Sequence, residues 1–512
     1  MSNPEPPAEG VRLSSATGRW VLACSVLGSG MAMLDGTIVN IALPRIGEGL
    51  GATLAALQWT VNGYLLTLAG LILLGGGLGD RYGRRKVFVI GVVWFALASA
   101  LCGAAPNSGV LIAARALQGV GGALLTPGSL ALVQSTYRPQ DRAKAVGAWS
   151  GLGGVAGAIG PFLGGYLVDG PGWRWIFLIN LPLAAVVVAI AVRHVPESRD
   201  RTASGSFDIL GAVLAALCLA GVTYALISAS GHPSPVAVAV PAAAGLACGW
   251  AFLRTERRRP SPMLPLSVFS SKLFTSMNLV TLCLYAAIGG VFFVLPVQLQ
   301  IAAGYSALRA GLATLPVTVL MLLLSAPAGA LAQRIGPRWP LTVGPLVTAC
   351  GLLLLTRVSP DTSSYVVDVL PAVVVQGLGM CLFVAPLTAT VLASVEVDHA
   401  GVASGVNNAA ARVAQLLIVA ALPLAVGLSD HAYRSPHAVN SAFGKAMLIC
   451  AGLCAVAALL AAVLVPSGAL REDEAKGPVA QPQCAPHCGV LAPPVEPGRP
   501  ERPPPGQPEQ PA

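Results

Sequence analysis

Residues 76–85 read Gly-Gly-Leu-Gly-Asp-Arg-Tyr-Gly-Arg-Arg, and residues 329–338 read Gly-Ala-Leu-Ala-Gln-Arg-Ile-Gly-Pro-Arg. The two segments share one frame, in which Gly, Leu, a small residue, a polar residue, Arg, Gly and Arg recur in order. A second echo pairs Gln-Gly-Val-Gly at 118–121 with Gln-Gly-Leu-Gly at 376–379. Two echoes at nearly the same spacing indicate an internal repeat. The sequence therefore predicts two related halves.

Long apolar runs surround these segments. Of the 512 residues, 55% are hydrophobic and 10% are charged, whereas an ordinary soluble domain carries about 25% charged residues. The mean hydropathy is +0.72. The runs are continuous rather than alternating, which excludes a membrane β-barrel, and a helical span needs about 20 such residues. Fourteen spans are expected near 20–44, 57–78, 87–105, 110–133, 143–168, 176–193, 208–229, 236–253, 275–298, 308–332, 340–357, 366–391, 402–427 and 443–465.

With this count, each echo pairs one span with the span eight places further on. The predicted fold is an all-α membrane protein with two six-helix halves and an inserted two-helix hairpin, the arrangement that repeat-built transporters use to hold a site between halves. The last 35 residues, 478–512, contain 12 prolines and lack the apolar mass to fold. The expected division is a cytoplasmic N-terminal segment 1–19, a first half 20–200, inserted helices 201–260, a second half 261–465 and a disordered Pro-rich tail 466–512.

Positive charge sets the expected orientation, because Lys and Arg gather on the cytoplasmic side of membrane proteins. With a cytoplasmic N-terminus, 23 of the 31 Lys and Arg fall in cytoplasmic segments and six fall outside. Both termini are then cytoplasmic in a multi-pass protein of the inner (plasma) membrane. The net charge of +9 follows from this anchoring, and nucleic acid is not an expected partner. The remaining two basic residues, Arg115 and Arg412, fall within spans.

Several kinds of chemistry find no support in the sequence. Nine of the 11 cysteines lie in apolar runs, and the tail residues Cys484, His487 and Cys488 offer too few ligands for a metal site. No phosphate-binding loop, metalloprotease motif or catalytic triad is present. The glycines at 151 and 153 resemble a dinucleotide fingerprint but follow no strand. We therefore expect no enzyme activity, no metal and no cofactor.

Other motifs strengthen the pattern given by the repeat. They are Leu-Asp-Gly-Thr-Ile-Val-Asn-Ile-Ala-Leu-Pro at 34–44, Arg115 with Gln-Gly-Val-Gly at 118–121, Gly-Pro-Phe-Leu-Gly-Gly at 160–165, Trp-Arg-Trp-Ile-Phe-Leu-Ile-Asn-Leu-Pro at 173–182, and Ser-Gly-Val-Asn-Asn at 404–408. Together they resemble the major facilitator superfamily, and within it the fourteen-spanner drug:proton antiporters. One departure is Ala156, where the helix-5 motif of that family has Gly.

The resemblance implies a proton-coupled exporter of a drug, antibiotic or secondary metabolite that works by alternating access. Its partners are a small-molecule substrate, protons and the bilayer, its energy source is the proton gradient, and it functions as a monomer. The alternatives are a transporter of one endogenous metabolite, an importer, or a membrane sensor on the same fold. A sensor is expected to have lost Asp35, Arg115 and Asp80, and all three are present.

Asp35 is the one acidic residue expected well inside a span. An ionised carboxylate is costly in hydrocarbon, so Asp35 is expected to face the cavity and to carry the proton. The alternative is a neutral, hydrogen-bonded Asp. Arg115 stays charged and needs an anion, carbonyl groups or water. The resemblance gives it a role in proton coupling, and the alternative is a structural ion pair or carbonyl clamp.

The remaining candidate residues form three groups. The cavity is expected to hold Asn40, Asn62, Tyr64, Gln118, Asn407, Asn408 and Arg412. A gating loop is expected at Gly76, Asp80, Arg81, Gly83 and Arg84, with Asp80 pairing with an Arg at a neighbouring helix end. A helix-5 hinge is expected at Gly157, Gly160, Pro161, Gly164 and Gly165.

Overall fold

A computed structural model describes residues 10–199, 208–231, 234–259, 262–360, 364–395 and 400–468. Within these ranges the chain is helical apart from its connections, and fourteen helical segments are long and apolar enough to cross a membrane. The predicted number of spans is therefore confirmed. The Pro-rich tail, including Cys484, His487 and Cys488, lies outside the described residues.

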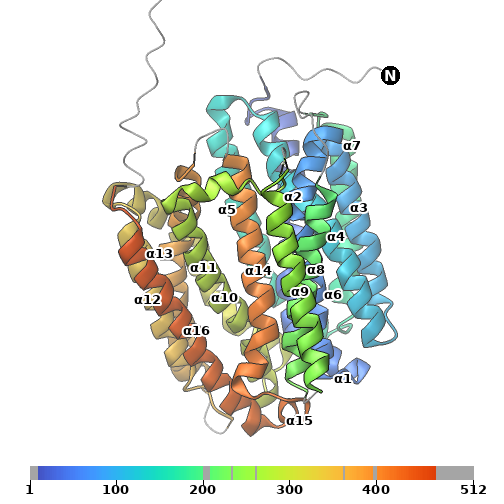
Figure 1. Cartoon of the computed structure of the whole chain (residues 1–512), viewed down its shortest axis with the longest axis vertical. Helices are drawn as coiled ribbons and strands as arrows, with labels where there is room; N and C mark the ends of the chain where they lie inside the picture. Colours follow the sequence, from blue (N-terminus) through green and yellow to red (C-terminus); the bar gives the residue numbers. More distant parts are fainter. Residues whose placement is uncertain are drawn as a thin grey trace, which may run out of the picture. The chain divides into compact units, whose positions relative to one another are not determined.

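The first bundle contains six spans. They are α1 (Ala16–Leu50), α2 (Leu54–Tyr82), α3 (Arg84–Gly103), α4 (Ser108–Thr136), α5 (Pro139–Asp169), and a sixth span formed by the short α6 (Trp175–Leu178) and α7 (Asn180–His194). Helix α4 packs between α2 and α3, and α1 packs along α5. Figure 1 shows α3 and α4 running side by side.

The second bundle repeats this packing. Its elements are a 3-10 turn η1 (Leu266–Ser270), α10 (Lys272–Val297) with the π-helix η2 (Gln298–Ala302), α11 (Ala307–Ile335), α12 (Arg338–Leu355), the π-helix η3 (Tyr365–Val369) with α13 (Leu370–Ala393), α14 (Ala400–Val426), the short α15 (Asp430–Tyr433) and α16 (Pro436–Leu464). Helix α13 packs on α11 and α12 as α4 packs on α2 and α3. Each of these helices lies eight spans after its counterpart, as the sequence repeat predicted.

Two glycines show that the repeat is structural as well as sequential. Gly83 and Gly336 occupy the same place in the two copies, and their φ angles are 113° and 91°. Each residue ends a helix and donates its backbone N–H to the carbonyl four residues earlier, at Gly79 and Ala332. A side chain is strained at such φ angles, so the tight turn requires glycine in both copies.

The inserted hairpin consists of α8 (Ile209–Ala229) and α9 (Pro235–Glu256). Helix α8 packs on α2 and α14, which belong to different bundles, whereas α9 packs mainly on α8. Large apolar side chains of α9, such as Leu246 and Trp250, are 66% and 64% exposed. Such a surface suits contact with lipid tails.

Three of the expected helix-5 hinge residues, Gly160, Gly164 and Gly165, lie at close helix contacts. A Cβ atom at Gly160 would collide with Thr37 of α1, and one at Gly164 would press on Ile38. Gly165 faces Leu308 of α11 in the other bundle. Helix α5 continues without a break past Pro161. Small residues let these backbones approach, and a hinge motion stays a prediction.

A close contact between α3 and α4 provides a test of the first bundle. A Cβ atom at Gly121 of α4 would lie 2.6 Å from the backbone nitrogen of Phe95 on α3, whereas a Cβ atom at Gly151 of α5 would meet open space. Gly121→Ala is therefore expected to destabilise the protein by about 1–3 kcal/mol through overpacking. Thermal unfolding in detergent should show a lower midpoint for Gly121→Ala and no decrease for the matched control Gly151→Ala. Equal midpoints would contradict the described α3–α4 contact.

Candidate functional site

A buried ion pair lies at the centre of the first bundle. Asp35 comes from the middle of α1, and Arg115 from α4. The Arg115 Nη1 atom lies 2.5 Å from Asp35 Oδ2, and the exposed fractions of the two side chains are 1% and 0%. A charge buried this deeply persists only with an opposite charge and hydrogen bonds to its remaining atoms. The sequence predicted both residues but not that they pair directly.

The second carboxylate oxygen of Asp35 is held by two amides. Gln118 donates from Nε2 to Asp35 Oδ1 over 2.8 Å, and Asn180 of α7 donates from Nδ2 over 3.4 Å. Both amide groups also contact the Ser99 hydroxyl of α3, at 3.2 Å and 3.0 Å, and Ser99 donates to the carbonyl of Phe177. The network therefore connects α1, α3, α4, α6 and α7.

Arg115 has partners besides Asp35. Its Nη1 atom donates to Gln118 Oε1 over 2.7 Å, and its Nε atom donates to the Thr60 carbonyl over 3.1 Å. The guanidinium carbon lies 4.4 Å from the centre of the Tyr64 ring. A cation over an aromatic face is stabilised by the ring quadrupole. These contacts add α2 to the network.

The burial of Asp35 differs from what the sequence led us to expect. The carboxylate points into the first bundle, and the residue is only 1% exposed, so it does not open onto the space between the bundles. The physical reason is that Arg115, Gln118 and Asn180 supply within the bundle the charge and hydrogen bonds that water in a cavity would otherwise supply.

Sequence reasoning missed three members of this network as site residues. Asn180 lies within the motif at 173–182, which was a signal for it. Ser99 and Thr60 stand in apolar runs without any motif, and Thr60 contributes only its backbone carbonyl. No feature of the sequence around Ser99 or Thr60 distinguishes them from packing residues.

Four other cavity candidates take different positions. Asn407 donates to Thr281 Oγ1 over 2.7 Å, within the second bundle, whereas Asn408 is exposed and bonds its own helix at Ser404. Asn40 also bonds its own helix, at Gly36. Asn62 is fully buried, and neither atom of its amide group has a hydrogen-bond partner. Whether these residues contact cargo stays a prediction.

The gating loop forms the kind of contact expected of Asp80. Asp80, near the end of α2, pairs over 2.7 Å with Arg84, the first residue of α3, and the Asp80 side chain is 40% exposed. Arg85 has partners just after the end of α7: it donates to the Val195 carbonyl and lies 3.6 Å from Glu197. The Glu197 carboxylate also accepts the backbone N–H of Arg85. The tight turn at Gly83 brings the start of α3 next to the end of α2, so Arg84 meets Asp80 across the turn. A gating role for this contact stays a prediction.

Two aspartates join the bundles at one end of the molecule. Asp169, at the end of α5, accepts the backbone N–H groups of Ala307 and Leu308, at 3.2 Å and 2.8 Å, at the start of α11. In the reverse direction, Asp430 of α15 accepts the N–H of Leu54 at the start of α2, at 2.5 Å. Each bundle thus supplies a carboxylate to a helix N-terminus of the other, where unpaired N–H groups and the helix dipole favour negative charge.

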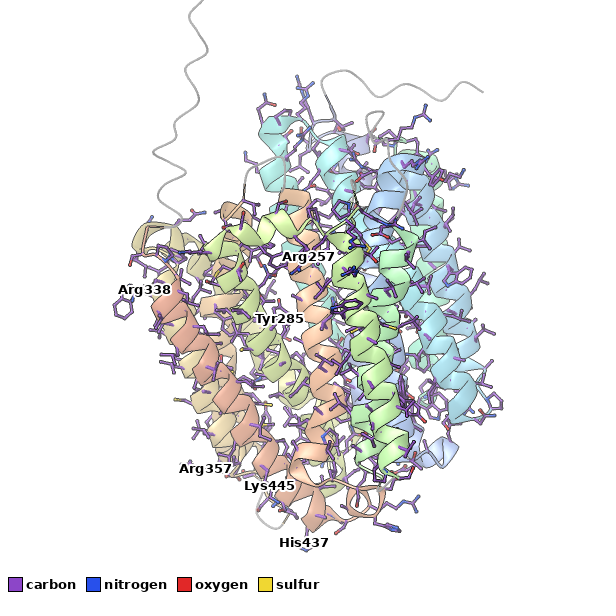
Figure 2. The ribbon with its side chains drawn as sticks, in the orientation of Figure 1. Arg257, Tyr285, Arg338, Arg357, His437 and Lys445 are labelled. Carbon is purple, nitrogen blue, oxygen red and sulfur yellow. The ribbon has the colours of Figure 1, made fainter. Side chains whose placement is uncertain are left out.

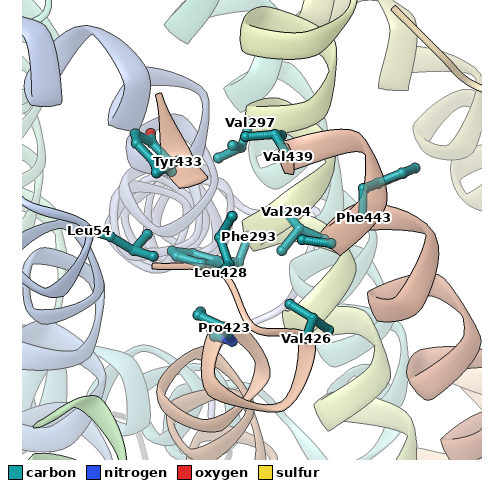
Figure 3. Close-up of a pocket in the computed structure, with 11 residues that line it drawn as sticks. Leu54, Phe293, Val294, Val297, Pro423, Val426, Leu428, Tyr433, Val439 and Phe443 are labelled. Atoms are coloured by element: carbon teal, nitrogen blue, oxygen red, sulfur yellow. The ribbon is translucent and has the colours of Figure 1, made fainter. Parts of the chain in front are cut away.

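Further hydrogen bonds join the bundles at the same end. Gln58 of α2 donates to the carbonyls of Val419 and Ala420 on α14, and Gln300 donates to the carbonyl of Ile41 on α1. A small pocket lies nearby (Figure 3) and is lined by Leu54, Phe293, Val294, Val297, Pro423, Val426, Leu428, Tyr433, Val439, Ala442 and Phe443. No acidic or basic side chain lines this pocket, so it offers no charged group to a proton or cargo.

Comparisons with known proteins agree with the fold and the motifs described above. Residues 25–419 and 277–495 match the profile of the Major Facilitator Superfamily. The chain is 34% identical over 468 residues to puromycin resistance protein pur8 of Streptomyces alboniger, covering 89% of this chain and 93% of that protein. It is 36% identical over 423 residues to the tetracenomycin C resistance and export protein of Streptomyces glaucescens, covering 81% and 77%.

A solved structure agrees at the level of the fold. The D-xylose-proton symporter superimposes with a TM-score of 0.64 at 15% identity, covering 88% of this chain and 98% of that chain. The resemblance noted in the sequence is confirmed by the profile and by relatives that match most of the chain. The chain therefore belongs to the major facilitator superfamily.

Proposed function

We propose that this protein exports a drug, antibiotic or secondary metabolite across the cell membrane in exchange for protons. The observation that carries the proposal is the Asp35–Arg115 pair, a titratable carboxylate and a permanent cation buried together in a membrane bundle. Ionisable residues at such depth are costly and mark proton or substrate pathways. The relatives named for resistance and export supply the class of cargo.

The network around the pair supports both protonation states of Asp35. A proton on Oδ2 removes the negative charge that faces Arg115, yet Arg115 keeps the Gln118 amide oxygen, the Thr60 carbonyl and the Tyr64 ring. The cation is therefore never left without partners, which lowers the cost of protonation relative to an isolated pair. In this mechanism Asp35 is the group that binds and releases the proton, and Arg115 stays charged in both states.

The proposed orientation places both termini in the cytoplasm. Figure 2 shows Arg257 and Arg338, from segments with many basic residues, toward one end of the molecule, and Arg357 and Lys445 toward the other. The aspartate contacts of Asp169 and Asp430 then lie at the outer face. They hold that face closed in an inward-facing state, and alternating access requires them to break.

Transport of a single endogenous metabolite is the second candidate. Resistance distinguishes the two: cells that overproduce the chain are expected to tolerate higher concentrations of at least one compound in a panel that includes puromycin and tetracenomycin C. Growth inhibition measured against an empty-vector strain provides the test. Unchanged tolerance to every compound at confirmed expression would favour the single-metabolite transporter.

Reporter fusions test the orientation. Fusions after Arg199 and after Arg259 are expected to report the cytoplasm, because an even number of spans, the α8–α9 hairpin, lies between them. A fusion after Ser230, between α8 and α9, should report the outer side. If the fusions after Arg199 and Arg259 report opposite sides, the hairpin does not cross the membrane twice.

Substitution at the ion pair tests the coupling. Asp35→Asn keeps the shape of the protonated side chain but cannot release a proton, so proton-driven export should fall to background while the protein stays in the membrane. Arg115→Ala should also abolish it. Uptake of a compound identified by the resistance panel, measured in inverted vesicles with an imposed pH gradient, gives the readout. Glu48→Gln, at an exposed acid paired with Arg45, serves as the control. Full pumping by Asp35→Asn would show that another group carries the proton.

Removal of the aspartate contacts tests the closed outer face. The double variant Asp169→Ala, Asp430→Ala removes the hydrogen bonds that these two carboxylates accept. A hydrogen bond to a charged group contributes about 1.5–3 kcal/mol. The population should shift toward an outward-open state. A cysteine introduced at Ala56, beside the α2 N-terminus, should then react faster with an impermeant maleimide added from outside. The same cysteine in the Glu48→Gln background should react no faster than in the otherwise unchanged protein. Equal reaction rates with and without Asp169 and Asp430 would contradict the proposal that these residues hold the outer face closed.

A further inference from the structure

The space around Arg412 contains a positive charge that the proton site does not use. Arg412 lies twelve residues into α14 (Ala400–Val426), roughly 18 Å along the helix axis, so it is deep in the span. It is half-buried. Its guanidinium donates to Gln415 Oε1 over 3.2 Å, a neutral acceptor one turn away. Among the residues that the structure describes, no carboxylate forms an ion pair with Arg412, whereas Arg115 is fully paired with Asp35.

The surroundings of Arg412 place it between the two bundles. Helix α14, which carries Arg412, packs against α2 of the first bundle and α10 of the second. Figure 2 shows Tyr285 of α10 about midway between the two ends of the molecule. Gln415 packs against Gly289 of α10. Arg412 therefore belongs to the second bundle but faces the region where α2 of the first bundle meets α10 and α14.

An unpaired amide group lies in the same region. Helices α2 and α14 run antiparallel, because Gln58 bonds Val419 while Leu73 packs against Gly405. Residues four apart share a helix face, so Asn62 follows Gln58 on the face toward α14. At this register Asn62 lies opposite Gln415, one turn from Arg412. Asn62 is 0% exposed, and neither its Nδ2 nor its Oδ1 atom has a hydrogen-bond partner.

We propose that Arg412 and Asn62 form a subsite for an acidic group of the cargo, such as a carboxylate, phenolate or sulfonate. This inference rests on the proposed export function and adds the charge of the cargo to it. A guanidinium in a low-dielectric site needs an anion, and its planar fork matches a carboxylate or sulfonate. The Asn62 amide contributes a donor to the same group. In the absence of cargo the two side chains keep unused hydrogen-bonding capacity, which is costly in a buried position.

An acidic cargo also fits the proposed energetics. Export of an anion and entry of a proton both move charge in the direction that a negative-inside membrane potential favours. Arg412 lies on α14 of the second bundle, whereas Asp35 and Arg115 lie on α1 and α4 of the first. A substitution at Arg412 therefore changes a charge that is not part of the Asp35–Arg115 pair.

Two matched probes test the subsite. The dyes are 8-anilinonaphthalene-1-sulfonate and its uncharged parent N-phenyl-1-naphthylamine, which differ by one sulfonate. Binding is measured to the full chain in nanodiscs, with empty nanodiscs as the blank. The wild-type protein is expected to bind the sulfonate more tightly than the amine, by about tenfold or more, as a charge-assisted hydrogen bond provides.

The variants separate charge recognition from folding. Arg412→Gln should remove the preference while amine binding stays unchanged, and Arg412→Lys should retain part of it. Asn62→Asp should also weaken sulfonate binding, because the new carboxylate repels the sulfonate and pairs with Arg412. Arg193→Gln, at an exposed arginine near the end of α7, removes the same charge elsewhere and should change nothing.

Three outcomes would overturn the inference: no binding of the sulfonate, no preference for it in the wild-type protein, or an equal loss of both dyes in Arg412→Gln. The last outcome would assign Arg412 a purely structural role. Resistance of cells to the antibiotic panel is measured in parallel. If the sulfonate preference is absent while proton-dependent resistance persists, the acidic subsite is wrong and the export function stands. If cells that overproduce the wild-type protein are no more resistant than the empty-vector strain, the export function itself is refuted.

Discussion

The ion pair between Asp35 and Arg115 is the interaction on which the first bundle depends. It draws together α1 and α4, and through Gln118, Asn180 and Ser99 it fixes α3 and α7 around the same point. Removing one partner of such a pair leaves a buried charge, at a cost of about 3–5 kcal/mol. The interaction that organises the packing is also the one to which we assign the coupling proton. Stability and proposed coupling share one set of atoms.

Much of the fold could be predicted from the sequence because membrane insertion leaves few alternatives. Every backbone group in hydrocarbon must be paired, so long apolar runs become helices. The repeat of Gly83 at Gly336 then fixed the relation between the bundles, since both turns need a positive φ. Asp35 and Arg115 were recognisable because a charged side chain inside a membrane span is costly and is found mainly where it has a partner or a function.

The rest depended on contacts between residues far apart in sequence. Nothing in the sequence around Asp35 shows whether it faces a cavity or a neighbouring helix, and the structure shows the latter. Ser99 and the Thr60 carbonyl join the site through position alone. The contacts of Asp169 with α11 and of Asp430 with α2 join residues 138 to 376 positions apart, and local patterns carry no information at that range. Asp80 was expected to pair with an Arg at a neighbouring helix end, and its partner is Arg84 at the start of α3, within the same motif.

The placement of the α8–α9 hairpin makes the two seams between the bundles unequal. One seam lies between α2 and α14, and α8 packs against both of these helices; the other lies between α5 and α11. In the part of the chain that the structure describes, the first seam is thus backed by extra helices and the second has no such backing. A lipid-soluble molecule diffusing within a leaflet meets a screened entrance on one flank and an unscreened one on the other. The hairpin thus makes the two flanks of a pseudo-symmetric protein different toward the bilayer.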